Sequence, residues 1–174
     1  LPINRKQKVF PNGTLVIENV ERMSDQATYT CVAKNSQGYS VRGNLELQVM
    51  VPPLIVPFNF GETPSNPGDA VVVNCVATKG DLPLDISWTF SSETIDSSQH
   101  RDITTMQLGP RASALSINSV SANHQGNYTC IVQNAAARAE YAATLVVNVP
   151  PRLPPRWILE PTDKAFAQGS DAKV

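Results

Sequence analysis

The sequence predicts an all-β protein built from tandem antiparallel β-sandwiches, with one complete sandwich flanked by two partial ones. Apolar and polar residues alternate over short stretches, as they do in strands that bury one face. Clusters of Gly, Pro, Asn and Ser separate these stretches. No window carries a sustained apolar stripe at the helical period of about 3.6 residues. Regular short strands without helices indicate an antiparallel sandwich or barrel, and the spacing of Cys75, Trp88 and Cys130 decides for the sandwich.

The expected strands follow one another along the chain. In the first part, the alternating apolar positions are Leu15 and Ile17, then Tyr29, Cys31 and Ala33, then Leu45, Leu47 and Val49. In the middle part, they are Val71, Val73, Cys75 and Ala77, then Ile86 and Trp88, then Leu115 and Ile117. Because successive side chains of a strand point to opposite faces, each set lies on one face of its sheet.

An internal repeat sets the expected domain organisation. The stretch that begins at Leu15 aligns with the stretch that begins at Leu115, so the repeating unit is about one hundred residues long. We expect residues 1–50 to be the rear of one domain, 51–149 a complete domain, and 150–174 the first strands of a third, where Trp157 and Phe166 would pack. The junctions Pro52-Pro53 and Pro150-Pro151 have little freedom in φ, which predicts stiff connections.

The composition excludes several classes of function. The 174 residues contain 14 Lys and Arg against 15 Asp and Glu, a formal charge of -1 that gives no basis for a nucleic-acid surface. At 41% hydrophobic and 17% charged residues, the chain is typical of a packed globular protein. No apolar run approaches the ~18 to 20 residues of a membrane span, and the first residues are charged rather than signal-like. Membrane anchoring is therefore expected only through parts outside this chain.

Spaced Cys, Trp and Tyr residues carry a family resemblance. Cys75, Trp88 and Cys130 are spaced as in the Cys, Trp, Cys pattern of the immunoglobulin superfamily, and Tyr128 and Tyr29 each stand two residues before a Cys. This resemblance implies a disulfide between Cys75 and Cys130, with Trp88 packed over it and the two tyrosines forming corners. Cys31 would then have no partner in this chain, because its partner position lies before Leu1.

The motif around Cys31, which is repeated around Cys130, resembles the intermediate set of that superfamily. Tyr29, Cys31 and Ala33 match it together with Asn35 and Gly38. The second copy departs from it, since His124 replaces the usual Asp, which Asp25 supplies in the first copy, and Ala137 replaces the Gly. A salt bridge from this turn is therefore not expected in the second domain.

No residue constellation indicates catalysis or metal binding, so we expect no enzyme, no cofactor and no metal. His100 and His124 are the two imidazoles, both expected in solvated loops, and the nucleophile-elbow, zinc-protease and phosphate-loop motifs are missing. Cys31 is interpreted as a structural residue rather than a reactive thiol.

Two sequons and one tripeptide remain. Asn12-Gly13-Thr14 and Asn127-Tyr128-Thr129 satisfy the acceptor rule for N-glycosylation, which predicts an extracellular chain. Asn12 is expected in an exposed turn, whereas Asn127 is expected in a turn beside the tyrosine corner with poorer access. Lys79-Gly80-Asp81 is similar to an integrin-binding tripeptide, but we interpret it as ordinary turn chemistry.

A closer resemblance covers nearly the whole chain. The stretches from Pro11 to Pro53, PFNFGE with TKGDLPLDISW, and PPRWILEPTDKAFAQGS are similar to arthropod Dscam, the Down syndrome cell adhesion molecule family, around its sixth to eighth immunoglobulin domains. The resemblance implies a surface receptor of neurons and haemocytes whose variable, alternatively spliced seventh domain, here 51–149, pairs with identical copies of itself. Other cell-surface partners are compatible with it.

Strand alternation then predicts where such pairing occurs. Because Cys75, Leu115 and their alternating neighbours face the core, Val72, Asn74, Ser116 and Asn118 are expected on one outer sheet face. The segment Leu54 to Phe60, expected as a strand, is the next candidate. Two other classes stay open, a ligand-binding ectodomain of a receptor kinase and an intracellular muscle array, although the latter usually lacks the paired cysteines.

Overall fold

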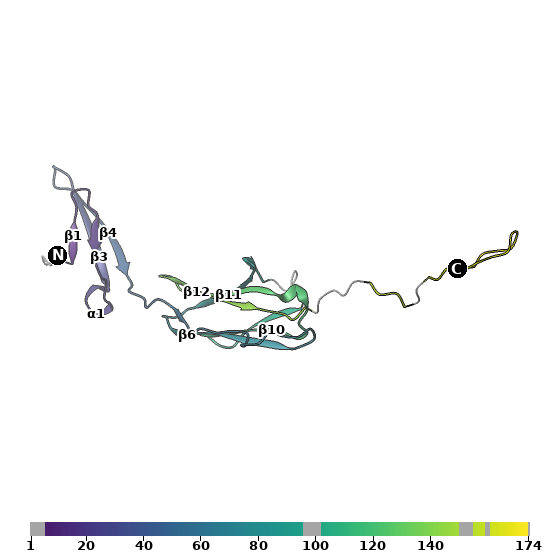
Figure 1. Cartoon of the computed structure of the whole chain (residues 1–174). Helices are drawn as coiled ribbons and strands as arrows, with labels where there is room; N and C mark the ends of the chain where they lie inside the picture. Colours follow the sequence, from purple (N-terminus) through teal and green to yellow (C-terminus); the bar gives the residue numbers. More distant parts are fainter. Residues whose placement is uncertain (1–5, 96–101, 150–154, 159–160, 174) are drawn as a thin grey trace.

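The computed structural model describes residues 6–95, 102–149, 155–158 and 161–173. The polypeptide runs from a group of N-terminal strands into a central β-sandwich (Figure 1). The described residues beyond 149 contain no strand, and Trp157 and Phe166 are exposed there. The assignment of this segment to the first strands of a third domain stays a prediction.

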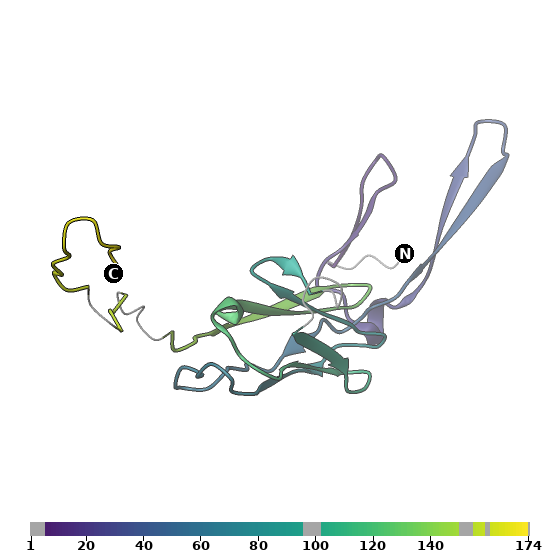
Figure 2. The same cartoon turned by 90° about the vertical axis from the view of Figure 1, so that its right-hand side faces the viewer.

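The N-terminal part consists of two antiparallel hairpins. Its elements are β1 (Gln7–Val9), β2 (Leu15–Ile17), the short helix α1 (Arg22–Asp25), β3 (Ala27–Lys34) and β4 (Ser40–Leu47). Strand β1 pairs with β2, and β3 pairs with β4, in two separate sheets (Figure 2). Most side chains of β3 and β4 are exposed, Cys31 among them as a free thiol. A part of this kind needs further strands to bury its apolar face.

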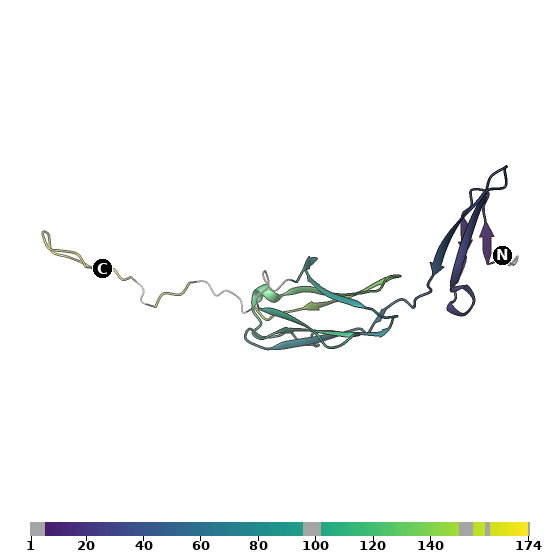
Figure 3. The ribbon, with the colours of Figure 1, turned by 180° about the vertical axis from the view of Figure 1, so that it is seen from behind.

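The central part is a sandwich of two four-stranded sheets that lie face to face (Figures 1 and 3). One sheet has the order β5 (Leu54–Ile55), β6 (Val71–Lys79), β10 (Ala112–Ile117) and β9 (Ile103–Gln107). The other has the order β12 (Arg138–Leu145), β11 (Gly126–Gln133), β7 (Asp85–Phe90) and β8 (Glu93–Thr94), with the 3-10 helix η1 (Ala122–His124) before β11. All pairings within these sheets are antiparallel, as the sequence predicts.

The core lies between the two sheets and is built by strict alternation. On β6, Val71, Val73 and Cys75 are buried, whereas the residues between them are exposed. Strands β10 and β11 repeat this pattern, with Leu115 and Tyr128 fully buried. One buried face on each sheet therefore fixes which side chains remain on the two outer faces.

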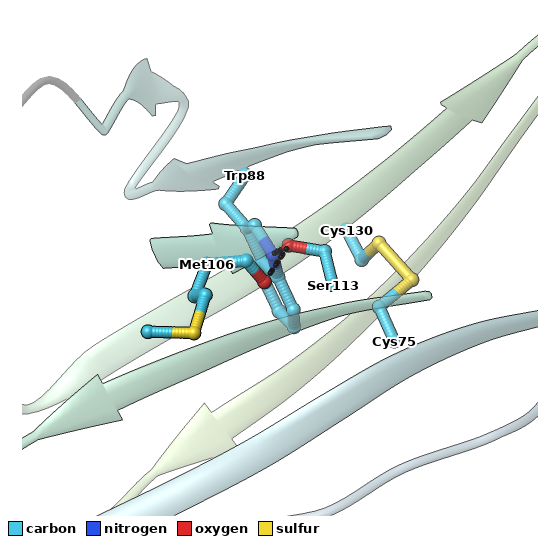
Figure 4. Close-up of a disulfide and its surroundings, with 5 residues drawn as sticks. All are labelled: Cys75, Trp88, Met106, Ser113 and Cys130. Carbon is cyan, nitrogen blue, oxygen red and sulfur yellow. Dashed lines mark hydrogen bonds between the residues drawn. A yellow bond between two sulfur atoms is a disulfide. The ribbon is translucent and has the colours of Figure 1, made fainter. Parts of the chain in front are cut away.

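The disulfide between Cys75 and Cys130 joins the two sheets, from β6 to β11. Trp88 of β7 lies beside it with only 3% of its surface exposed (Figure 4). Its Nε1 donates a hydrogen bond to Ser113 Oγ at 3.0 Å, and Ser113 Oγ donates to the Met106 carbonyl at 3.2 Å. The buried indole nitrogen is thus satisfied, and the tryptophan is tied to β10 and β9 of the opposite sheet.

The segment after β5 differs from the predicted strand over Leu54 to Phe60. Only Leu54–Ile55 forms a strand, and the chain then crosses to the other sheet, where Ser65 bridges Val147 in parallel. Phe58 packs against Trp88 with ring centroids 5.3 Å apart, and Phe60 packs against Tyr128 at 5.1 Å. Because these aromatic residues pack inward, the segment closes the opening between the sheets instead of extending one of them.

Both tyrosines that precede a cysteine form corners. The Tyr29 hydroxyl donates to the carbonyl of Asp25 at 2.9 Å, and the Tyr128 hydroxyl donates to the carbonyl of His124 at 2.8 Å. The repeated geometry ties the start of each strand to the turn before it. Burial raises the pKa of the Tyr128 phenol above its ordinary value, because ionisation would leave a charge inside the core.

The two turns use different side chains for the same task. In the first, Asp25 is 2% exposed, accepts the Glu21 N–H at 2.7 Å and pairs with Lys6. The hydrogen bond from Lys6 holds the pKa of Asp25 below its ordinary value, and the same bond raises the pKa of Lys6. In the second, His124 Nδ1 accepts the Ser121 N–H at 2.9 Å.

The prediction of a solvated His124 is therefore wrong. The residue is 7% exposed, because its ring turns back onto the start of η1 and caps it. A neutral imidazole nitrogen replaces the carboxylate oxygen as acceptor, and no ion pair of His124 is found among the described residues. His100, the other predicted loop histidine, lies outside the described residues.

Replacing Tyr128 by Phe should lower the free energy of unfolding by about 1 kcal/mol at neutral pH, because one buried hydrogen bond is lost. The wild-type chain should also lose stability as the pH rises above ~10, since tyrosine then ionises in the unfolded state before it does in the folded one. Urea unfolding at pH 7 and above pH 10 measures both effects. Tyr141→Phe is the control, and an equal loss in that variant would contradict the prediction.

Candidate functional site

The outer face of the first sheet is uncharged over three strands. Eight side chains from three cross-strand rows form it, and we call them the β6–β10–β9 outer face: Val72, Asn74, Val76, Thr104, Met106, Ala112, Ala114 and Ser116. Ser116 lies directly opposite both Val72 and Thr104, and Ala114 lies opposite Asn74 and Met106. The strand register thus places three of the four predicted residues side by side.

Exposure varies across this face. Val72 is 64% exposed and Met106 is 60% exposed, whereas Ser116 is half-buried between its two neighbours. Asn118 is exposed but follows the last residue of β10, so it lies at the margin of the face. The result is a nearly flat surface with two protruding apolar side chains and small polar groups between them.

Met106 and Val76 were not anticipated from the sequence. Strand β9 does not alternate, because it is an edge strand and four of its five residues are exposed. The apolar Ile103 could have indicated the inward-facing positions of β9. It pairs with Ile117, and this register places Met106 on the outer face. Val76 follows from the same alternation that identified Val72.

The outer face of the second sheet has a different character. Its rows contain Asp85, Arg138 and Glu140, and the last two form an ion pair along β12. Contact between two copies through this face would have to desolvate these charges. The two outer faces of one sandwich are therefore chemically unlike.

The two sequons lie in different settings. Asn12 is exposed in the turn between β1 and β2, where its Oδ1 accepts the Thr14 N–H at 3.0 Å. Asn127 lies within β11 rather than in the turn before it, and its side chain is exposed on the outer face of the second sheet. The prediction of a turn position with poor access is wrong for Asn127, because β11 begins one residue earlier, at Gly126.

The tripeptide Lys79-Gly80-Asp81 packs against the start of the sandwich. Gly80 is buried with φ of +121°, and an added Cβ would lie 2.9 Å from the Cα of Pro53. The Asp81 carboxylate accepts the Val51 N–H at 2.8 Å and pairs with Arg22. A carboxylate used in this way is not presented to a receptor, which supports the interpretation as turn chemistry.

Val51, in the segment that connects β4 to the sandwich, makes further hydrogen bonds. We call the residues that take part the Val51 joint: Arg22, Val51, Asp81 and Asn134. The Val51 carbonyl accepts the Asp81 N–H at 3.1 Å and Asn134 Nδ2 at 2.9 Å. Arg22 also donates from Nε to the carbonyl of Val49 at 3.1 Å. The predicted stiffness at Pro52-Pro53 thus has a second physical basis, in bonds between the connection and two loops of the sandwich.

The described residues contain neither a metal-binding group of side chains nor a membrane-spanning helix. Over these residues, no group of three or more His, Cys, Asp or Glu side chains could hold a metal ion. Across the same ranges, no helix has the length and apolar character needed to cross a membrane.

The comparisons with known proteins agree with this architecture. An immunoglobulin domain family matches residues 52–134. The cell adhesion molecule Dscam1 of Drosophila melanogaster is 63% identical over 174 residues, which is 100% of this chain and 8% of that protein. The chain therefore spans less than a tenth of its curated relatives.

Two solved structures are also similar. The N-terminal eight immunoglobulin domains of Down syndrome cell adhesion molecule isoform 1.30.30 share 59% identity with a TM-score of 0.64, over 99% of this chain and 21% of that one. The Dscam1 Ig7 domain, isoform 5, shares 40% identity with a TM-score of 0.54, over 56% of this chain and 98% of that one. The sequence similarity covers the whole chain and the fold is shared as well, so the chain belongs to the Dscam family of immunoglobulin-domain proteins.

Proposed function

We propose that the chain is part of the extracellular region of a cell-surface adhesion and recognition receptor, and that its central sandwich binds an identical copy through the β6–β10–β9 outer face. The names of the relatives, which are cell adhesion molecules, support the general role. The recognition role in neurons and haemocytes that the family resemblance implies belongs to the same proposal, as do further cell-surface partners. Residues 51–149 are the proposed binding domain, between parts of two neighbouring domains.

The chemistry of the β6–β10–β9 outer face carries the self-association proposal. In a symmetric pair, each group near the two-fold axis meets its own copy, so a charge there would repel itself. The face contains no charged residue, and its polar groups are an amide and hydroxyls that both donate and accept hydrogen bonds. Asn74 and Ser116 can therefore bond to their own copies, while Val72 and Met106 supply apolar contact area.

The disulfide supports the extracellular location. A bond between Cys75 and Cys130 forms and persists in oxidising compartments, whereas thiols of intracellular proteins are usually kept reduced. An intracellular muscle array is accordingly disfavoured. Analysis of the intact protein by non-reducing mass spectrometry should find this bond, with Cys31 as a free thiol.

Placing a carboxylate at Val72 tests the self-association. Val72→Asp should weaken the pairing of the chain about tenfold or more, because two like charges meet near the axis and a buried apolar contact is lost. Asn118→Lys should weaken pairing less, since that residue lies at the margin of the face. Sedimentation equilibrium and bead aggregation measure the effect after circular dichroism has confirmed the fold.

The matched control is Ala142→Asp, which puts the same charge on an exposed position of β12 in the other sheet. It should leave pairing unchanged. Unaltered pairing in Val72→Asp and Asn118→Lys would rule out the β6–β10–β9 outer face. The segment around Leu54 and Val56, both exposed beside β6, would then be the next surface to test.

A further inference from the structure

We infer that Asn127 carries an N-linked glycan which shields the outer face of the second sheet, so that association between copies is directed to the opposite sheet. The first half of this inference, occupancy, is independent of the proposed self-association. The second half rests on it.

The side chain of Asn127 is placed for modification. It alternates with buried Tyr128 on β11 and therefore points away from the core. Its Oδ1 accepts a hydrogen bond from Thr144 Oγ1 on β12 at 2.6 Å, which orients the amide. Among the described residues, Nδ2 makes no hydrogen bond, so the nitrogen that receives the sugar is left to solvent.

The acceptor hydroxyl is also available. Thr129 completes the sequon, stands on the same outer face and is only half-buried. Transfer from a lipid diphosphate oligosaccharide forms a bond from the anomeric carbon to Nδ2 and breaks that carbon's bond to the diphosphate. The diphosphate leaves as an anion and the amide gives up one proton, so the step needs no oxidant or reductant.

The position of this glycan decides which surface it affects. Asn127 lies opposite Thr144, and the next row of the face holds Thr89, Thr129 and Ala142. Neighbouring strands are about 4.8 Å apart, which is close to the width of one sugar ring. A branched oligosaccharide at Asn127 therefore covers adjacent rows of the second sheet and hinders the approach of another flat surface.

The β6–β10–β9 outer face has the opposite property. Its asparagine, Asn74, is followed by Cys75 and Val76, and Asn118 at its margin is followed by Ser119 and Val120. Neither triplet ends in Ser or Thr, so neither asparagine is an acceptor. The chain thus directs modification to the charged face and leaves the uncharged face bare.

Occupancy is tested on the whole chain secreted from eukaryotic cells. Enzymatic deglycosylation in heavy-oxygen water should convert Asn127 to labelled Asp, as read by peptide mass spectrometry. Asn127→Gln and Thr129→Val should both abolish the glycan, and the second variant leaves the asparagine itself in place. Thr129→Ser is the control that keeps the sequon. An unmodified Asn127 in the secreted wild-type chain would overturn the inference.

The effect on association is tested by moving the glycan. Val76→Thr turns the triplet that begins at Asn74 into a sequon on the β6–β10–β9 outer face, and Val76→Ala changes the same side chain without creating a sequon. Glycosylated Val76→Thr should associate at least ~10-fold more weakly than Val76→Ala. Loss of the Asn127 glycan in Thr129→Val should leave association within about twofold of wild type.

Two results separate this inference from the proposed function. If the wild-type chain does not self-associate at all, the proposed function fails, while the mass spectrum still decides occupancy. If the chain associates but loses that association when the Asn127 glycan is removed, the glycan belongs to the contact and the shielding role is wrong.

Discussion

Replacing both bonded cysteines, Cys75→Ala with Cys130→Ala, is expected to lower the free energy of unfolding of the central sandwich by ~4 kcal/mol. The two cysteines are 55 residues apart in the sequence, so the disulfide closes a long loop in the unfolded chain. Without the disulfide, the unfolded chain gains conformational entropy, which favours unfolding. Urea unfolding of the variant and wild type, followed by circular dichroism, measures the difference.

Cys31→Ala is the matched control for the disulfide. Its thiol is free and exposed on β3, so its removal should leave the stability of the central sandwich unchanged. A double variant as stable as wild type would show that the disulfide does not limit unfolding of this domain. A large loss in Cys31→Ala would show that this cysteine has a structural partner after all.

Replacing Trp88 by Ala is expected to cost a similarly large amount, ~3–5 kcal/mol, because the side chain is buried between the sheets. The variant leaves a cavity beside the disulfide and Phe58, and Ser113 Oγ loses its indole donor. Trp88→Phe should cost less, since it retains an aromatic ring but not the hydrogen bond. Thermal and urea unfolding provide the comparison.

The second tryptophan supplies the control for Trp88. Trp157 is 71% exposed, so Trp157→Phe should leave unfolding unchanged and make Trp88 the sole tryptophan fluorophore of the chain. Fluorescence in that background then reports on the core directly. Equal destabilisation by changes at Trp88 and Trp157 would mean that the burial difference between them does not govern stability.

Features set within single strands were predictable from the sequence. Alternation in a strand decides which residues face the core, so the inward direction of Cys75 and the outward direction of Val72 and Asn74 follow from it alone. The disulfide, the buried Trp88 and the corner at Tyr128 were predictable through the family resemblance that the spacing of Cys, Trp and Tyr carries.

Features that depend on contacts between distant segments were not predictable. Met106 reaches the β6–β10–β9 outer face through pairing of an edge strand that lacks alternation. His124 is buried because its ring caps η1, which a residue-type preference for solvent cannot show. The pair of Arg22 with Asp81 joins residues 59 positions apart and has no local signal in the sequence.

The Val51 joint has a mechanical consequence when the chain is under tension. Tension that enters the connecting segment from the N-terminal strands meets three bonds at Val51, from the Asp81 carboxylate, the Asp81 N–H and the Asn134 amide. These bonds are loaded together, since one residue holds all three. A pulling force is therefore shared between the loops after β6 and β11. Because Val51 is held in this way, the chain does not rotate freely at Pro52-Pro53 under tension.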